Sequence, residues 1–432
     1  MILQKHSKQS LLYLLIAYSL FAFLMPLSPA MFISIYILTA LAVLLLNDGD
    51  LLCFLTFSIC LAGSAERTSL FLIIFNIVMA VLIVKYLILA IKNKDKKKII
   101  FISSMACLIL CLMLYGLILT KLHVYKLSQA LGFMLVISCI YLFDKIDFKK
   151  LVLILCAGLI TSSILSLIAY ISGVAIYPPF SSDATSKVRF GAYFEYVNVF
   201  AFYCSLAQTC ILTLFLNKQV NMKKWWVLLL IVTVLGFTVF SKTYILVTIL
   251  VYGVVILLGF IQTKNKKRYI KFCAIGLILL AIVCVCCYKY ILIIIERFSA
   301  SQYYGGGVLN VATTGRIGIW KGYIKHWASS WLYILFGCGI TANWVGEYTP
   351  HNFYISMLYR FGIVGLLLLI GIIVWSVKQC KATKNINWYL PIFIVLVNAL
   401  VEDISSSLFT CLPLLITILI LLKSKNGCID DK

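Results

Sequence analysis

The side chains best suited to chemistry in this sequence are cations and a histidine near the ends of apolar segments. Arg316 follows Gly315 at the expected start of a helix over 316–327. Backbone N–H groups and the positive end of the helix dipole point to the same place. A guanidinium can grip a phosphate there through two parallel hydrogen bonds. The pattern therefore predicts an anion site at Arg316.

His351 and Asn352 lie where an apolar segment begins, in the sequence TPHNFYISMLYRFG. Thr349 is suited to cap a helix and Pro350 to the first helical position, which would put His351 and Asn352 in the first turn. The dipole disfavours an imidazolium there, so His351 is predicted to be neutral near pH 7 and able to accept a proton. Asn352 could hold a hydroxyl or phosphate oxygen. Taken alone, the histidine could equally be an interfacial residue without a chemical role.

Two further cations accompany these residues. Arg189 lies in KVRFGAYFEYVNVF (187–200), just before an apolar segment. Lys242 lies in FTVFSKTYILV (237–247), at the expected tip of a helical hairpin. A turn lysine that extends to the membrane interface is the alternative interpretation of Lys242.

Arg360 lies nine residues beyond His351, inside the apolar segment and roughly on the opposite side of a helix. A charge at that depth is costly and usually faces a polar interior. We expect Arg360 to support the structure by pairing, with Glu402 and Asp403 as candidate partners.

The elements that would position these residues are membrane helices. The chain has 432 residues, of which 63% are hydrophobic. Apolar runs near the roughly 20 residues that a spanning helix needs recur along its length. This composition excludes a soluble domain and predicts an all-α, polytopic integral membrane protein with a single transmembrane domain over 1–432.

Fourteen candidate spans can be placed in the sequence. They are 11–25, 30–46, 51–62, 70–91, 99–119, 127–143, 151–175, 196–216, 225–240, 243–261, 272–294, 353–376, 389–401 and 404–422. The spans 51–62 and 389–401 are short enough to be half-helices or re-entrant segments.

The distribution of charge predicts the orientation. With both termini in the cytoplasm, the inside segments hold 24 of the 37 Lys and Arg residues, as the positive-inside rule requires. The net charge of +23 is then a topology signal, and nucleic acid is not an expected partner. Two outer segments, 177–195 and the long loop 296–352 between spans eleven and twelve, are the places where chemistry is expected.

The long outer loop also contains an amphipathic pattern. Apolar residues recur at helical spacing, and Lys321, Lys325 and Ser329 lie on another face. The apolar stripe consists of Ile317, Trp320, Ile324, Trp327 and Trp331. An aromatic stripe with a basic reverse side is typical of a helix in the membrane interface, either as a simple anchor or as part of a site.

Several of these segments together resemble the O-antigen polymerase and O-antigen ligase superfamily of bacterial surface-polysaccharide proteins. TGRIGIWKGYIKHW (314–327) is similar to the family's [ST]-G-R-x-x-x-W segment, and LFGCGI (335–340) to its F-G-x-G element. PHNFYISMLYRFGIVGLLLLI (350–370) is similar to its helix that begins with H-N-x-Y and ends in G-x-x-G-L. The matching residues are Thr314, Gly315, Arg316, Trp320, Phe336, Gly337, Gly339, His351, Asn352, Tyr354, Gly362 and Gly365.

Two upstream segments extend the resemblance, which covers roughly 187–370. RFGAYFEYVN, which begins at Arg189 and ends at Asn198, is similar to a family segment that leads from an arginine to an asparagine. FSK, which ends at Lys242, is similar to a turn that carries arginine in the family. Arg360 stands where relatives often carry an acidic residue, and the first half of the chain has no matching motif.

The resemblance implies a membrane-embedded, GT-C-like glycosyltransferase that is inverting and independent of metal and other cofactors. The donor would be a glycan on undecaprenyl diphosphate at the outer leaflet, and the acceptor a second lipid-linked oligosaccharide. Arg189, Lys242 and Arg316 would neutralise the departing diphosphate. His351 would orient or deprotonate the acceptor hydroxyl. Asn198, Lys321, Asn352 and Tyr354 would contact the diphosphate or the glycan.

Three functions remain open on this basis. The first is a polymerase of O-antigen, capsular or exopolysaccharide repeat units, and the second is a ligase that transfers a finished glycan. The third is a flippase for lipid-linked oligosaccharides, which predicts internal repeats and charges at mid-membrane depth. The expected location is the bacterial cytoplasmic membrane, with an extracytoplasmic site, surrounding membrane lipid, and a chain-length regulator and a flippase as protein partners.

Overall fold

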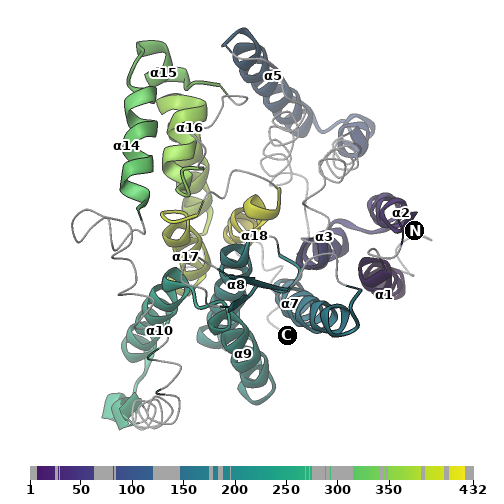
Figure 1. Ribbon diagram of the computed structural model, residues 1–432, viewed down its shortest axis with the longest axis vertical. Coiled ribbons are helices and arrows are strands. Elements are labelled where there is room, and N and C mark those ends of the chain that lie inside the picture. Colours follow the sequence, from purple (N-terminus) through teal and green to yellow (C-terminus); the bar gives the residue numbers. More distant parts are fainter. Residues whose placement is uncertain are drawn as a thin grey trace.

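The computed structural model shows a predominantly helical chain (Figure 1). The residues that it describes are 7–24, 28, 30–62, 81, 84–119, 146–174, 179–182, 188–194, 196–267, 269–271, 273–274, 288, 292, 315–339, 345, 349–380, 385–402 and 408–423.

The helices follow the apolar segments of the sequence closely. The first part of the chain contains α1 (Ser7–Leu24), α2 (Ala30–Leu45), α3 (Asp48–Ala62), α5 (Lys96–Leu119) and α7 (Phe148–Ile171). The middle contains α8 (Val197–Leu216), α9 (Met222–Phe237) and α10 (Lys242–Gln262). The last part contains α14 (Arg316–Trp327), α15 (Trp331–Phe336), α16 (Phe353–Cys380), the 3-10 helix η5 (Ile386–Tyr389), α17 (Leu390–Asn398) and α18 (Leu408–Lys423).

Four of the described helices are long and apolar enough to cross a membrane: α7, α8, α10 and α16. Shorter apolar helices accompany them within α1, α2, α9, α17 and α18. The chain is therefore a mostly helical protein of membrane type, as predicted. The total of fourteen spans stays a prediction, because 127–143 and nearly all of 272–294 lie outside the described residues.

A short β-hairpin joins α7 to α8, where the sequence indicated only an outer loop. Strand β1 (Phe180–Ser182) pairs antiparallel with β2 (Val188–Phe190), and Ser181 lies opposite Arg189. The Phe190 ring packs edge-on against Phe200 of α8, with ring centroids 5.9 Å apart. This contact fixes β2, and with it Arg189, beside the start of α8.

Helix α8 is the central element, because it is buried along nearly its whole length. It runs antiparallel to α17. Asn385 and Asn387, at the start of the η5–α17 segment, donate hydrogen bonds to Asn217 at the end of α8. At the end of α17, Asn398 donates to Ser205, in the middle of α8, over 3.2 Å. The chain that continues beyond α17 therefore starts about two turns short of the start of α8 and on the same side of the amide contacts.

Candidate functional site

Arg316 and His351 meet at the carboxylate of Glu402, just beyond the end of α17. Nη2 of Arg316 lies 3.9 Å from Oε1, and Nδ1 of His351 lies 4.0 Å from Oε2. Arg316 also donates from Nη1 to the backbone carbonyl of Val401. The Glu402 side chain is only 13% exposed, so its charge is partly removed from water and interacts strongly with both neighbours. These three residues are called the Glu402 cluster below.

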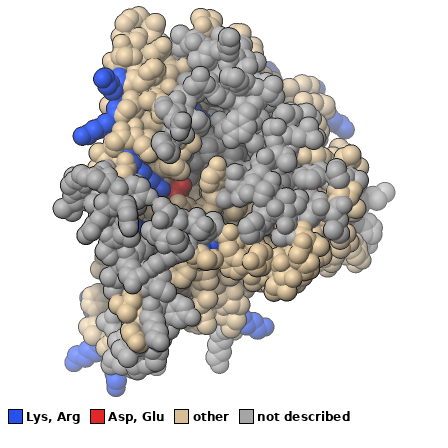
Figure 2. Space-filling model, viewed as in Figure 1, with Lys and Arg blue, Asp and Glu red and all other residues tan. Residues whose placement is uncertain are grey.

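Figure 2 shows basic and acidic side chains next to one another at the lower end of α14. That is the end at which Arg316 begins the helix. The His351 side chain is 37% exposed, whereas those of Arg316 and Glu402 are 17% and 13% exposed, so the cluster is partly accessible through His351.

The start of α14 confirms the predicted place of Arg316. Gly315 precedes the helix with φ of 80°, a left-handed conformation that glycine adopts without strain. The helix is held against the next segment by Trp320, whose Nε1 donates to the carbonyl of Pro350 over 2.7 Å. Since Pro350 precedes His351, this bond ties the arginine-bearing helix to the histidine.

The predicted apolar stripe lies on α14 except for Trp331. The helix ends at Trp327, and Trp331, which is 66% exposed, begins α15. Ile324 is 48% exposed, whereas Tyr323, which is outside the stripe, is fully buried and packs edge-on against Tyr359 of α16. The place of the stripe in the membrane interface stays a prediction.

The predicted capping of α16 is also wrong. The helix begins at Phe353, and Asn352 is its cap, since its Oδ1 accepts from the backbone N–H of Ile355 at 3.1 Å. His351 therefore lies outside the first turn, in a left-handed conformation with φ of 45°. The helix-dipole argument made from the sequence does not apply to His351 in this geometry, because His351 precedes the helix.

Backbone contacts with α17 explain this helix start. Nδ2 of Asn352 donates to the carbonyl of Leu400 over 2.9 Å, and the N–H of Phe353 donates to the carbonyl of Ala399 over 2.9 Å. The beginning of α16 is thus anchored on the residues that lead to Glu402. Asn352 holds the site together, although the sequence indicated a substrate contact.

Two glycine motifs meet at a break in α16. Gly362 leaves the helical conformation, with φ of 64° and ψ of −165°. A Cβ there would collide with the carbonyl group of Leu335, and a Cβ on Gly337 would collide with the backbone of Arg360 and Phe361. The N–H of Cys338 donates to the carbonyl of Tyr359 over 2.7 Å. The F-G-x-G segment therefore docks, backbone to backbone, against the break in α16.

Cys338 is buried in this contact, and burial raises the pKa of its thiol to about 11. A neutral thiol at physiological pH is a poor nucleophile. Cys338 thus packs the joint between α15 and α16 and is not a reactive group.

Two other predicted residues of α16 lie inside the protein. Arg360 is 3% exposed. Glu402, one of its two expected partners, contacts Arg316 and His351 instead. The other expected partner, Asp403, lies outside the described residues. The hydroxyl of Tyr354 donates to the carbonyl of Leu396 in α17 over 3.0 Å. Tyr354, which is half-buried, therefore joins α16 to α17, and its contact with substrate stays a prediction.

A second group of polar residues surrounds Arg189. Its Nη2 donates to Oδ1 of Asn198 over 2.6 Å, and its Nε donates to the carbonyl of Val239 over 2.9 Å. Val239 belongs to the α9–α10 turn, which ends at Lys242, the first residue of α10. The structure thus brings together Arg189, Asn198 and the turn that carries Lys242, while Arg316 lies in the Glu402 cluster, so a single site that joins all three cations stays a prediction.

Both groups lie at the same end of the α8–α17 pair. Asn198 is in the first turn of α8. Glu402 comes just after α17, and its backbone N–H donates to the carbonyl of Asn398, the last residue of that helix.

Lys321 belongs to neither group. It is exposed on α14 and makes no hydrogen bond or ion pair with any residue that the structure describes.

Glu402 is the member of the cluster that the sequence alone did not assign to the site. An acidic residue at the outer end of an apolar segment, on the side where cations gather, was the available signal. The chain matches no family model and no curated protein sequence. The geometry of the described residues and the motif resemblance are therefore what supports a function.

Proposed function

We propose that this chain is a membrane glycosyltransferase that polymerises lipid-linked oligosaccharide repeat units at the outer face of the bacterial cytoplasmic membrane. The observation that carries the proposal is the meeting of Arg316 and His351, which come from separate segments, at the Glu402 carboxylate. Both belong to the motifs that resemble the O-antigen polymerase and ligase superfamily. An anion-binding group beside a proton acceptor is what transfer from a diphosphate-linked donor needs.

The cations would act on the leaving group. When the bond between the anomeric carbon and the diphosphate oxygen breaks, negative charge grows on that oxygen. Fixed positive groups lower the energy of this state more than that of the bound donor. Arg316 would serve this purpose in the Glu402 cluster, with Arg189 and Lys242 providing a second cationic group at the same end of the α8–α17 pair.

His351 would act on the acceptor. Its imidazole takes the proton from an acceptor hydroxyl while the hydroxyl oxygen forms the new bond to the anomeric carbon, from the side opposite the diphosphate. Such direct displacement inverts the anomeric configuration. The Glu402 carboxylate then stabilises the imidazolium that forms, in the way that a buried aspartate supports the histidine of a catalytic triad. General-base assistance of this kind is typically worth about 10²–10⁴ in rate.

The other residues would hold these groups in place. Asn352 and Tyr354 connect the start of α16 to α17, and Trp320 connects α14 to Pro350. The charges that the reaction needs are supplied by side chains, so the proposed mechanism uses no metal and no cofactor. The donor and acceptor would be oligosaccharides on undecaprenyl diphosphate.

The test is replacement of the two reacting residues in the native host. We expect His351→Ala and Arg316→Ala each to abolish polymer while the protein stays in the membrane at normal amounts. Lys325→Ala is the matched control, because Lys325 is an exposed cation on the same helix as Arg316. Full-length polymer in both variants would refute the assignment.

The same experiment separates the alternatives when it is repeated with purified protein and lipid-linked repeat units. A polymerase yields a ladder of products that differ by one repeat. A ligase would instead transfer a single glycan to a different acceptor, and a flippase would form no new glycosidic bond. A ladder that disappears in His351→Ala supports the polymerase.

A further inference from the structure

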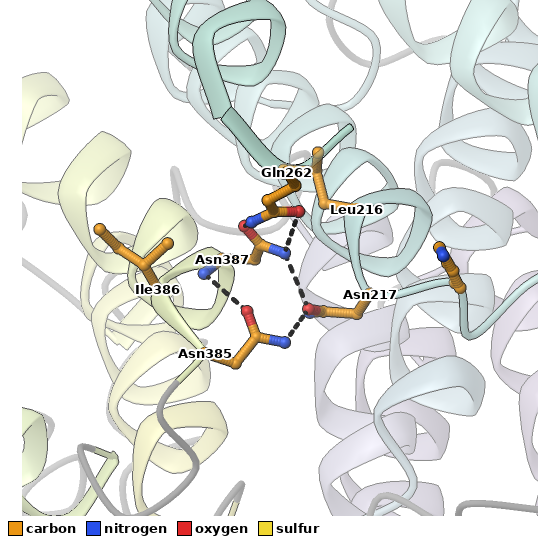
Figure 3. Close-up of a pocket in the computed structure, with 7 residues that line it drawn as sticks. Leu216, Asn217, Gln262, Asn385, Ile386 and Asn387 are labelled. Atoms are coloured by element: carbon orange, nitrogen blue, oxygen red, sulfur yellow. Dashed lines mark hydrogen bonds between the residues drawn. The ribbon is translucent and has the colours of Figure 1, made fainter. Parts of the chain in front are cut away.

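An open cavity of about 380 Å³ lies at the end of the α8–α17 pair opposite the Glu402 cluster (Figure 3). Its wall is formed by the last turns of α8 and α10 and by the start of η5. The lining residues are Leu216, Asn217, Lys218, Gln262, Asn385, Ile386 and Asn387. This volume is within the range of about 300–1,000 Å³ that small-molecule sites occupy.

Four amide side chains face one another in this cavity, as Figure 3 shows. Asn385 donates to Oδ1 of Asn217 at 2.6 Å, and Gln262 donates to Oδ1 of Asn387 at 2.8 Å. Asn387 in turn donates to Asn217 at 3.1 Å. Each amide carries donors and acceptors side by side, which is the arrangement that hydroxyl groups match.

One donor in this network has no acceptor. Nδ2 of Asn217 is buried and makes no hydrogen bond to any residue that the structure describes. A buried donor without a partner costs free energy, so rotation of the Asn217 amide toward an oxygen atom of a bound group would be favoured.

The ends of the helices favour hydroxyl groups over a charged phosphate inside the cavity. Both α8 and α10 present their C-termini here, where the carbonyl groups and the negative end of the dipole lie. Among the residues that the structure describes, exposed cations lie at the mouth and in the adjoining turn, namely Lys218, Lys264 and Lys266. Ile386, which is 56% exposed, adds an apolar edge where lipid chains would begin.

We propose that this cavity binds the glycerol-phosphate headgroup of an anionic membrane lipid such as phosphatidylglycerol. The headgroup hydroxyls would be held by Asn217, Gln262 and Asn387, with the phosphate at the lysines of the mouth. α8 and α10 are long and apolar enough to span a membrane, so their ends lie at the headgroup level of the bilayer. This site is separate from the proposed transferase site and does not depend on it.

The experiment uses the purified full-length chain in detergent and compares short-chain phosphatidylglycerol with short-chain phosphatidic acid, which has the phosphate but no hydroxyls. Native mass spectrometry measures binding. We expect phosphatidylglycerol to bind about tenfold more tightly, because phosphatidic acid makes no contacts with the amides. We expect sn-glycerol 3-phosphate, which has the polar group without lipid chains, to bind far more weakly.

Two variants locate the site. Gln262→Ala removes an exposed amide with little risk to folding and should weaken phosphatidylglycerol binding about fivefold, and Asn387→Ala should weaken it more. Asn93→Ala, which removes an exposed amide from another turn, should change nothing. Equal binding of the two lipids, unchanged binding in Gln262→Ala and Asn387→Ala, or equally tight binding of free glycerol phosphate would each overturn the proposal.

Discussion

The two ends of the α8–α17 helix pair are built from different chemistry. One end carries charges: Arg316 and His351 at Glu402, with Arg189 beside Asn198. The other end carries neutral amides, in which Asn217, Asn385 and Asn387 bond to one another. The same two helices therefore position an ionic group at one end and an amide network at the other.

The difference has a physical meaning. Partly buried ion pairs are weak contributors to stability, because removing charge from water offsets most of their attraction. An amide network pairs most of its donors with its own acceptors and can hold helices together without charge. The ionic end is therefore the better candidate for chemistry, and the amide end for structure and for binding a polar group.

The largest effect is expected at the joint that supports the ionic end. Gly362→Ala would place a Cβ against the carbonyl of Leu335 at a φ of 64°. Strain and collision together should cost more than about 3 kcal/mol of stability, and transfer activity should be lost with it. The measurement is the melting temperature of the purified variant in detergent.

Gly371→Ala is the control in the same helix, because a Cβ at Gly371 meets nothing within 4 Å. It should leave the melting temperature unchanged or raise it slightly. Equal melting temperatures for the two variants would show that the F-G-x-G segment does not dock against the break in α16.

A smaller but specific effect is expected from Glu402→Gln. The variant keeps the shape of the side chain but removes the charge that stabilises an imidazolium at His351. We expect the transfer rate to fall about 10²-fold, while the amount of protein stays nearly the same. This fall in rate is at the lower end of the rate enhancement that general-base assistance contributes.

Asp95→Asn is the matched change at a carboxylate outside the Glu402 cluster. Asp95 caps α5 by accepting from Lys98, and asparagine caps equally well, so this variant should keep full activity. If Glu402→Gln transferred as fast as the control, the carboxylate would have no role in the mechanism.

The smallest effect is expected at the amide end. Asn217→Ala removes an acceptor shared by Asn385 and Asn387, which should lower stability by about 1–2 kcal/mol. The transfer rate per folded molecule should stay the same. A selective loss of activity at normal stability would show that the two ends are not independent.

The sequence predicted the helices well because apolar length alone marks them. It also located Arg316 at the start of a helix, where Gly315 adopts the left-handed conformation that precedes the first turn. The cap of α16 could not be chosen locally, because Thr349 and Asn352 are both suitable caps. Contacts with Ala399 and Leu400, far away in the sequence, decide for Asn352.

The features that the sequence did not predict also depend on contacts between distant segments or on very short elements. The role of Glu402 depends on how α14, α16 and α17 pack together, and the partner of Gly362 is the segment around Gly337. The three-residue strands of the β-hairpin are too short to give a periodic signal. Local pattern identified the candidate residues, whereas long-range packing determined which of them meet.

The most direct test of the central claim measures donor binding and transfer separately with purified protein and an undecaprenyl-diphosphate-linked repeat unit. Arg316→Ala should weaken donor binding and abolish transfer, because the guanidinium acts on the diphosphate. His351→Ala should bind the donor as the wild type does and still form no polymer, because the imidazole acts on the acceptor. Polymer formed by either variant at the wild-type rate would contradict the account.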